Sequence, residues 1–272
     1  MQIETLLGKS SVYKNTYDKT LLQPISRKLN RSTLNNLHAM HGFDIWNAYE
    51  VSWLNPKGKP EVAIAEFIFD ANSPNIIESK SLKLYLNSFN NTKFLQLTDV
   101  QKTIQTDLCE YSSSNVLVKI YPLTEAQVRL ANKLSGFNLD VLDIDIEKYD
   151  LDSSYLKNSS DEIIQEELCS NLLKSNCLVT NQPDWGSVYI QYEGPAICHQ
   201  GLLRYIISFR DHQEFHEHCA DRIFQDIFSI CKPNSLTIKT FFTRRGGLDI
   251  NSTRSSINIK PNEKNKIRLV RQ

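Results

Sequence analysis

Two nine-residue stretches decide the fold: residues 81–89 read SLKLYLNSF, and residues 201–209 read GLLRYIISF. Four positions coincide, namely Leu82/Leu202, Tyr85/Tyr205, Ser88/Ser208 and Phe89/Phe209. An internal repeat of this kind indicates that one structural unit occurs twice. We therefore expect two copies of a single module, and the elements around each copy agree with that expectation.

Strands are expected before each copy, where β-branched and aromatic residues flank a turn that contains Pro and Gly. The predicted hairpin arms are residues 46–53 and 61–69 in the first half, and residues 177–180 and 187–193, around the turn 181–186, in the second. The alternation in residues 188–192 favours a strand with one buried face. Later strands are expected at residues 116–121, 236–242 and 267–270.

A second helix is expected after each copy. The first is capped by Thr98-Asp99 and runs to about Tyr111, with Val100, Ile104 and Leu108 on one face; the second covers residues 214–231. Each half therefore reads strand, strand, helix, helix, strand. This order predicts an α+β protein with antiparallel sheets that carry helices on one face. The polar stretch 150–161 is the expected join, which divides the chain into modules 1–150 and 151–272.

Composition narrows the class of protein. Hydrophobic residues make up 40% of the chain, charged residues 23%, and the formal net charge is zero, so no overall field attracts nucleic acid or an anionic membrane. The start lacks the pattern of a signal peptide, and no apolar segment approaches the length of about 20 residues that a spanning helix needs. The six cysteines show no paired spacing and are expected to be reduced thiols of a cytoplasmic protein.

Cys177 is the first candidate for chemistry. It lies where a predicted strand runs into a turn, and Asp184 lies across that turn. A thiol there can face a pocket, and the carboxylate can accept or donate a proton. The alternative is a buried structural cysteine beside a turn-forming aspartate, because cysteine is among the most buried residue types.

The histidine-rich segment 212–219 is open to three interpretations. His212 and His216 are four residues apart, so on a helix they would share a face and could contribute to a metal site. They could also be ordinary polar residues at the start of a helix. In the third interpretation His216 and Glu217 recognise a guanine-like edge, since a carboxylate accepts two hydrogen bonds from it.

Two segments could bind phosphate. Residues 78–85 begin a predicted helix with Glu78 near its positive end and Lys80 and Lys83 as cations. Residues 243–251, followed by Arg254, form a glycine-rich cationic loop that is neither a Rossmann nor a Walker motif. An amphipathic helix start and a solvated hairpin turn are the alternatives.

Taken together, these segments resemble the 7-cyano-7-deazaguanine reductases in their long two-module form. That family's signature is Glu-(Ser/Leu)-Lys-(Ser/Ala)-apolar-Lys-(Leu/Tyr)-aromatic, and residues 78–85 match it at every position. Cys177 with Asp184 seven residues on, Phe-His-Glu at 215–217 and Arg-Arg-Gly-Gly at 244–247 are also similar. The resemblance covers nearly the whole chain.

The resemblance implies the tunnelling fold (T-fold), in which paired sheets close into a barrel on oligomerisation, and a homodimer. It implies reduction of a deazaguanine nitrile to an aminomethyl group by NADPH, in the queuosine pathway of transfer RNA, without a metal. The implied nucleophile is Cys177, which forms a thioimide, and the implied proton-transfer residue is Asp184. The implied substrate ligands are Ile77, Glu78, Ser79, His216 and Glu217, and the implied NADPH ligands are Ser79, Lys80, Arg245 and Gly246.

Two other functions stay open at this point. One is a zinc-dependent hydrolase on the same fold, resembling GTP cyclohydrolase, which would use the histidines and a cysteine. The other is a purine-binding or transfer-RNA-binding module without chemistry. The zero net charge argues against RNA, because contacts to phosphate dominate such binding.

Overall fold

The computed structural model describes residues 13–34, 37–126, 130–178, 180–262 and 267–272. The chain divides into two compact units. Unit 1 takes its residues from 1–29, 44–128 and 244–249, and unit 2 takes its residues from 30–43, 129–243 and 250–272. Neither unit is one continuous stretch, and the division at residue 150 stays a prediction. Among the described residues, no helix is long and apolar enough to cross a membrane.

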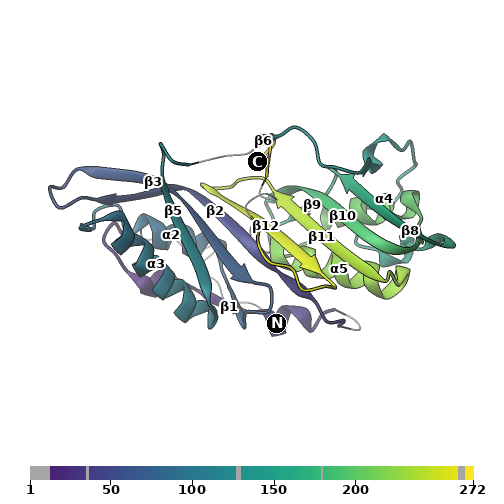
Figure 1. The fold of residues 1–272 in the computed structure, drawn as a ribbon, viewed down its shortest axis with the longest axis horizontal. Coiled ribbons are helices and arrows are strands. Elements are labelled where there is room, and N and C mark those ends of the chain that lie inside the picture. The colour runs from purple at the N-terminus through teal and green to yellow at the C-terminus, as the bar shows by residue number, and fades with distance from the viewer. Residues whose placement is uncertain (1–12, 35–36, 127–129, 179, 263–266) are drawn as a thin grey trace. The chain divides into compact units, whose positions relative to one another are not determined.

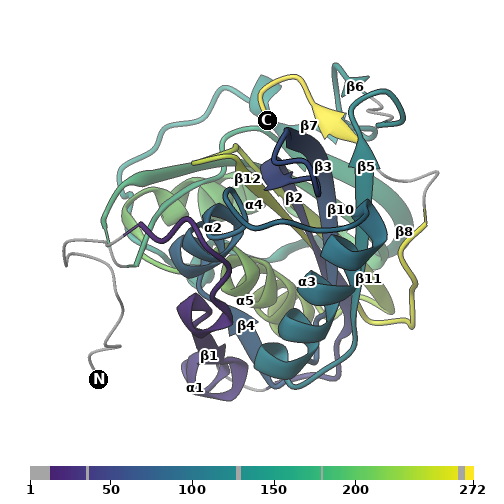
Figure 2. The same cartoon turned by 90° about the vertical axis from the view of Figure 1, so that its left-hand side faces the viewer.

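Unit 1 is a short antiparallel sheet with two helices on one face. Its strands lie in the order β5 (Val116–Pro122), β3 (Pro60–Asp70), β2 (His41–Leu54, of which the residues from Asp44 onward belong to this unit). Helices α2 (Ser79–Asn87) and α3 (Leu97–Ser112) lie on the same side of these strands (Figures 1 and 2). The remaining elements here are η1 (Lys19–Leu21), β1 (Pro24–Ser26), which pairs with β4 (Asn75–Ile77), and the first part of α1 (Arg27–Arg31).

Unit 2 is a larger sheet, also with two helices on one face. Its strands lie in the order β12 (Leu248–Ser255, in this unit from Ile250), β11 (Ser235–Phe242), β10 (Pro183–Ile197), β8 (Asn158–Ser170), β7 (Phe137–Asn138). β7 runs parallel to β8, so the sheet is mixed, and β9 (Lys174–Asn176) pairs with the start of β10. Helices α4 (His199–Ile207) and α5 (His216–Cys231) cover one face (Figure 1). The short elements are β6 (Leu130–Ala131), η2 (Leu139–Val141), η3 (Ser153–Tyr155), η4 (Ser208–Asp211) and β13 (Arg268–Leu269). The predicted α+β class is confirmed.

The repeated tyrosine makes the same contact in both units. The hydroxyl of Tyr85 in α2 donates to Asp107 in α3 at 2.6 Å, and the hydroxyl of Tyr205 in α4 donates to Asp226 in α5 at 2.7 Å. Both tyrosine rings are fully buried. A buried hydroxyl needs a hydrogen-bond partner, so each bond ties the first helix of a unit to the second.

The other repeated positions finish the first helix of each unit. Ser88 and Ser208 are the C-caps, and each hydroxyl donates at 2.6 Å to the carbonyl of the tyrosine three residues earlier. Phe89 and Phe209 are buried and meet that tyrosine ring edge to face, at centroid distances of 5.2 and 5.3 Å. The sequence repeat is therefore a repeat of helix-end packing.

The predicted helices are present, with one error at a cap. Val100, Ile104 and Leu108 of α3 are fully buried, as their spacing predicts. The cap predicted at Thr98-Asp99 is wrong, because the helix already begins at Leu97 and its N-cap is Gln96, whose side chain makes no capping hydrogen bond.

The hydrophobic pattern of the sequence gives a wrong prediction for two segments of unit 2. β8 begins inside the polar stretch predicted as the join, and residues 159–163 are exposed and mostly polar, so they give no strand signal. Residues 177–180 are expected in a hairpin arm, but β9 ends at Asn176, and the described residues of this range (177, 178 and 180) lie outside any strand. The strand at 188–192 has the predicted buried face, formed by Val188, Ile190 and Tyr192. On its other face Gln191 is exposed, whereas Tyr189 packs into a second small cluster with Leu134 and Leu269.

The cationic loop predicted at residues 243–251 ends earlier than expected, because residues 248–251 already belong to β12. Arg254 lies within β12, is fully buried, and donates from Nε to Asp221 of α5. Arg31 donates to the other Asp221 oxygen at 2.7 Å. Burial opposes ionisation of Asp221, but the charges of Arg254 and Arg31 outweigh it and hold its pKa below the ordinary value.

Replacing Asp221 with Asn should lower the free energy of unfolding at neutral pH by about 3–5 kcal/mol, because a buried arginine loses its counter-ion. The folded pKa of Asp221 is depressed, so its stabilisation is complete above the unfolded pKa of about 4 and is lost as pH falls further. Urea unfolding of both proteins at several pH values measures this. Glu162→Gln, at an exposed position of β8, is the control. An equal stability of Asp221→Asn and the native chain at neutral pH would contradict the assignment.

Candidate active site

Cys177 opens a tight turn in unit 2. Its N–H donates to the carbonyl of Gln182 at 2.8 Å, and the N–H of Asn181 donates to the carbonyl of Cys177 at 2.9 Å. Asn181 has a φ of 55°, in the left-handed region that asparagine tolerates better than most residues. The turn joins β9 to β10 and leaves Cys177 partly exposed. All six cysteines are thiols, as predicted.

Asp184 and His216 form a pair at the end of this hairpin. Asp184 is the second residue of β10, opposite Ser175 of β9, and is 4% exposed. His216 is the first residue of α5, and its Nε2 lies 3.2 Å from Asp184 Oδ2. The imidazole lies flat on the Phe242 ring, with centroids 3.9 Å apart and an interplanar angle of 4°. The ring is therefore held from one edge and one face.

The remaining nitrogen of His216 is available to a ligand. Nδ1 is buried and has no hydrogen-bond partner among the described residues. An imidazole nitrogen can donate or accept according to its tautomer. Glu217 follows in the first turn of α5 and is 2% exposed. The positive end of the helix favours a carboxylate there.

The second group of predicted residues lies in unit 1, around the start of α2. Glu78 is the N-cap: its Oε1 accepts from the N–H of Lys80 at 2.9 Å and its Oε2 accepts from the N–H of Ser81 at 2.7 Å. Glu78 is 2% exposed, and Ile77, the last residue of β4, is equally buried. Each carboxylate oxygen has a further lone pair, so capping does not exhaust its capacity to accept hydrogen bonds.

The glycine loop of unit 1 is braced by β2. Gly247 has a φ of 73°, and a Cβ there would lie 2.5 Å from Glu50 Cδ, so no larger residue fits without displacement. The Gly247 carbonyl accepts from the N–H of Tyr49 at 2.9 Å. Arg244 lies over the Tyr49 ring, 4.8 Å from its centroid, and Gly246 borders the side chain of Lys83. The loop is thus a shaped turn with cations at its surface.

The structure therefore gathers the predicted residues into two groups. Unit 2 holds Cys177, Asp184, His216 and Glu217, and unit 1 holds Ile77, Glu78, Ser79, Lys80, Arg245 and Gly246. The Asp184–His216 pair and the stack on Phe242 were not predicted. They join strands and a helix that are far apart in sequence, so only the Phe-His-Glu motif at residues 215–217 could have pointed to them.

The interpretation of His212 and His216 as one helical face is wrong. α5 begins at His216, and His212 lies before it, after η4. His212 Nε2 lies 3.1 Å from Glu214 Oε2, whereas His216 faces Asp184. Within the described residues, no group of three or more His, Cys, Asp or Glu side chains is placed to hold a metal ion.

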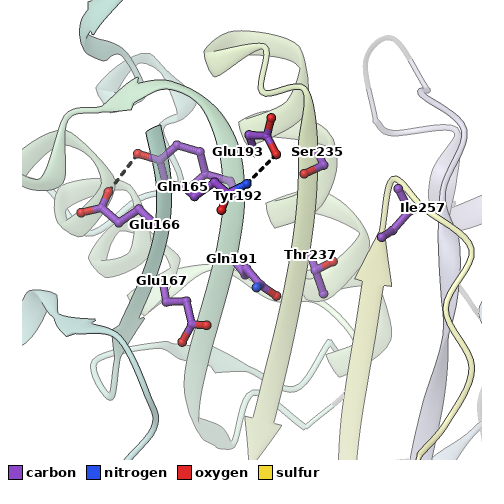
Figure 3. Close-up of a pocket in the computed structure, with 9 residues that line it drawn as sticks. All are labelled: Gln165, Glu166, Glu167, Gln191, Tyr192, Glu193, Ser235, Thr237 and Ile257. Atoms are coloured by element: carbon purple, nitrogen blue, oxygen red, sulfur yellow. Dashed lines mark hydrogen bonds between the residues drawn. The ribbon is translucent and has the colours of Figure 1, made fainter. Parts of the chain in front are cut away.

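A separate cavity of about 410 Å³ lies over β8, β10 and β11 of unit 2 (Figure 3). Its lining residues are Gln165, Glu166, Glu167, Gln191, Tyr192, Glu193, Ser235, Thr237 and Ile257. None of the predicted site residues lines it. Glu193 accepts from Gln165, and Glu166 accepts from Tyr192, both at 2.9 Å. Three glutamates make this cavity unsuited to a phosphate-bearing cofactor.

The fold and these residues define an α+β protein whose second unit contains a partly exposed thiol and a carboxylate–imidazole pair, a combination that thiol-dependent enzymes use. The chain matches the family model "Nitrile reductase, 7-cyano-7-deazaguanine-reductase N-term" over residues 13–120 and the model "QueF-like protein" over residues 183–261. It is similar to the NADPH-dependent 7-cyano-7-deazaguanine reductase of Legionella pneumophila (strain Lens), with 52% identity over 270 residues, 98% of this chain and 94% of that protein. The chain belongs to the family of the NADPH-dependent 7-cyano-7-deazaguanine reductases.

A solved structure, "Crystal structure of the archaeosine synthase QueF-Like in the apo form", is also similar to part of the chain. The sequence identity is 14%, and the match covers 38% of this chain and 100% of that one, with a TM-score of 0.32.

Cysteine alkylation in the folded protein should be faster at Cys177 than at Cys219 or Cys231. Burial raises the pKa of the Cys219 thiol well above its ordinary value and raises that of Cys231 to about 12, so neither supplies thiolate at neutral pH. Peptide mapping by mass spectrometry after brief exposure to iodoacetamide measures the order. Earlier labelling of Cys219 or Cys231 would show that the turn at Cys177 is closed to reagents.

Proposed function

We propose that this enzyme reduces the nitrile of 7-cyano-7-deazaguanine to an aminomethyl group with two molecules of NADPH, as a step of queuosine biosynthesis. The observation that carries the proposal is the 52% identity to a reductase of that name along 98% of the chain. Family membership favours the reductase over the zinc-dependent hydrolase and over a binding module without chemistry.

The proposed first step is the addition of the Cys177 thiolate to the nitrile carbon. A carbon–sulfur bond forms, the nitrile nitrogen takes a proton, and the product is a thioimide. A thiolate is strongly nucleophilic, and the turn at Cys177 leaves its side chain partly exposed. Asp184, which lies across the turn and contacts His216, is the proposed proton-transfer residue.

Two hydrides must follow, because a nitrile lies four electrons above an amine. NADPH, when bound, would supply each hydride. After hydride addition to the thioimide carbon the carbon–sulfur bond would break, so that the Cys177 thiolate leaves and an imine remains. Conversion of the imine to the amine would then need the second hydride on carbon and one proton on nitrogen. Covalent capture holds the substrate while the first hydride is added, and a buried site limits hydrolysis of the imine.

The proposed ligands of the deazaguanine are His216 and Glu217 in unit 2 and Ile77, Glu78 and Ser79 in unit 1. A carboxylate can accept hydrogen bonds from both the ring N–H and the amino group of a guanine-like edge. The buried position of Glu217 supports this role. A ligand that lacked those donors would make fewer hydrogen bonds to this carboxylate, so the site would discriminate against it.

The proposed NADPH ligands are Ser79, Lys80, Arg245 and Gly246, all in unit 1. Helix starts commonly bind phosphate through backbone N–H groups, but Glu78 already accepts from two of these groups in α2. Phosphate recognition would therefore depend on the side chains of Lys80 and Arg245. Such cations also account for a preference for the cofactor that carries the additional 2′-phosphate.

The finer assembly proposed for the enzyme rests on the family resemblance. We place both units in the T-fold class, with their sheets closing into a barrel when two chains form a homodimer, and we place the enzyme in the cytoplasm. The sheet of each unit has helices on one face, which is the layering that such a barrel requires (Figure 1).

Cys177→Ala should bind the nitrile yet form no covalent adduct and consume no NADPH, because the variant has no nucleophile. Intact-protein mass spectrometry after mixing with the nitrile alone measures the adduct, and the fall in absorbance of the reduced cofactor measures turnover. The native chain is the control for both. Substrate-dependent oxidation of NADPH by Cys177→Ala would refute the covalent route.

Arg245→Leu should raise the KM for NADPH by about tenfold or more, since one charge-assisted contact to phosphate is worth about 1.5–3 kcal/mol. The KM for the nitrile should stay unchanged. Steady-state kinetics with NADPH and with NADH at varied concentration measure the effect. Lys102→Leu, which removes an exposed cation from α3 of the same unit, is the control. An equal loss with both variants would point to a general charge effect.

A further inference from the structure

Residues 210–214, which include the last two residues of η4 and lead toward α5, form a strap that runs beside β9 in unit 2. The N–H of Asn176 donates to the carbonyl of His212 at 2.8 Å, and the N–H of Glu214 donates to the carbonyl of Asn176 at 3.2 Å. Asn176 and Gln213 thus form a parallel bridge. Cys177 is the next residue along the chain. The strap therefore forms backbone hydrogen bonds with the residue immediately before the proposed nucleophile.

Side-chain hydrogen bonds also connect the strap to the turn that contains Cys177. Gln213 Nε2 donates at 3.0 Å to the side-chain oxygen of Asn181, the left-handed residue of the Cys177 turn. Lys174 donates at 2.8 Å to the side-chain oxygen of Asn176 and also to the carbonyl of Arg210. The strap is consequently bonded to both ends of the turn that contains Cys177.

The strap is itself anchored to α5 by one buried ion pair. Arg222 donates from Nε to Glu214 Oε2 at 3.0 Å and from Nη2 to Glu214 Oε1 at 2.7 Å, a two-pronged contact. His212 contacts Oε2 of the same carboxylate at 3.1 Å. The Glu214 and Arg222 side chains are only 12% and 14% exposed. Burial opposes ionisation of Glu214, but the hydrogen bonds from His212 and Arg222 outweigh it and lower its pKa.

We infer that Glu214 is a positioning residue of the reductase, which acts through Arg222 and the strap to hold the Cys177 turn in register with His216 at the start of α5. This inference rests on the proposed function. Glu214 is two residues from His216, and its backbone bonds to the residue before Cys177. The Glu214–Arg222 ion pair therefore restrains both the Cys177 turn and the start of α5. An arginine that contacts a carboxylate through two nitrogens restricts orientation as well as distance.

The consequence of this arrangement is kinetic. Misplacement of a reacting group by about 1 Å can cost a factor of about 100 in rate, even when the substituted residue does not touch the substrate. Loss of the anchor should loosen the turn without removing the thiol, Asp184 or His216. Adduct formation should then slow, while general access to the thiol should increase.

The test compares Glu214→Gln, Arg222→Lys and the control Glu162→Gln with the native chain. In Glu214→Gln the rate of adduct formation with the nitrile alone should fall by about tenfold or more. The KM for NADPH should not change, because the proposed cofactor residues lie in unit 1. Alkylation of Cys177 by iodoacetamide should become faster while Cys219 stays unlabelled, which excludes unfolding as the cause. Arg222→Lys keeps the charge but loses the fork, so it should show a smaller loss.

A folded Glu214→Gln protein that forms the adduct at the native rate overturns the inference. If that variant does not fold, Arg222→Lys decides: native rates of adduct formation and alkylation overturn the inference, and a slower adduct with faster alkylation supports it. Should the native chain form no adduct, the proposed chemistry fails. The alkylation rates of the variants then still decide the positioning role.

Discussion

A tyrosine hydroxyl that folding removes from water needs an acceptor, and in each unit a carboxylate on the following helix supplies it. Tyr85 donates to Asp107, and Tyr205 donates to Asp226. Burial raises the pKa of both tyrosines, with the neighbouring carboxylate adding to the effect. Loss of the acceptor would leave a buried hydroxyl unsatisfied, at a cost of about 1–3 kcal/mol. Because each bond joins two helices, it also helps to set where their N-terminal ends lie, and Glu78 and His216 are found at the starts of α2 and α5.

The scaffold is repeated, but the chemistry on it is not. α2 and α4 both have nine residues, and α3 and α5 both have sixteen. Glu78 caps α2, whereas Cys198 occupies the equivalent position of α4. His216 begins α5, whereas Leu97 begins α3. Both units therefore share the helix packing but carry different polar residues at their helix starts. This difference explains why the family signature and the proposed nucleophile occur in different parts of the sequence.

The sequence predicts those elements and site residues that local periodicity or a short motif encodes. The helices followed from four-residue spacing, and Val100, Ile104 and Leu108 are buried as that spacing requires. β8 gives no local signal because its exposed first half needs no apolar alternation, and nothing local reveals that Asp221 is the partner of Arg254. The contact of His216 with Asp184 and the stack on Phe242 likewise join distant segments. Single residues were predictable from motifs, whereas the pairs that orient them depend on tertiary packing.

The carboxylates of unit 2 and their partners also affect whether a thiol in this unit can ionise. The N-terminal half of α5 and the residues before it carry Glu214, Glu217 and Asp221, and Asp184 lies next to His216. Uncompensated carboxylates near a thiol would oppose its ionisation.

In this unit the compensation is specific. Asp221 faces two arginines, Glu214 faces Arg222 and His212, and Asp184 faces the imidazole of His216. The same contacts that hold the strap and the start of α5 in place therefore also supply partners to these three carboxylates. Position and electrostatics are supplied by one set of interactions, so a substitution that breaks an anchor is expected to affect both.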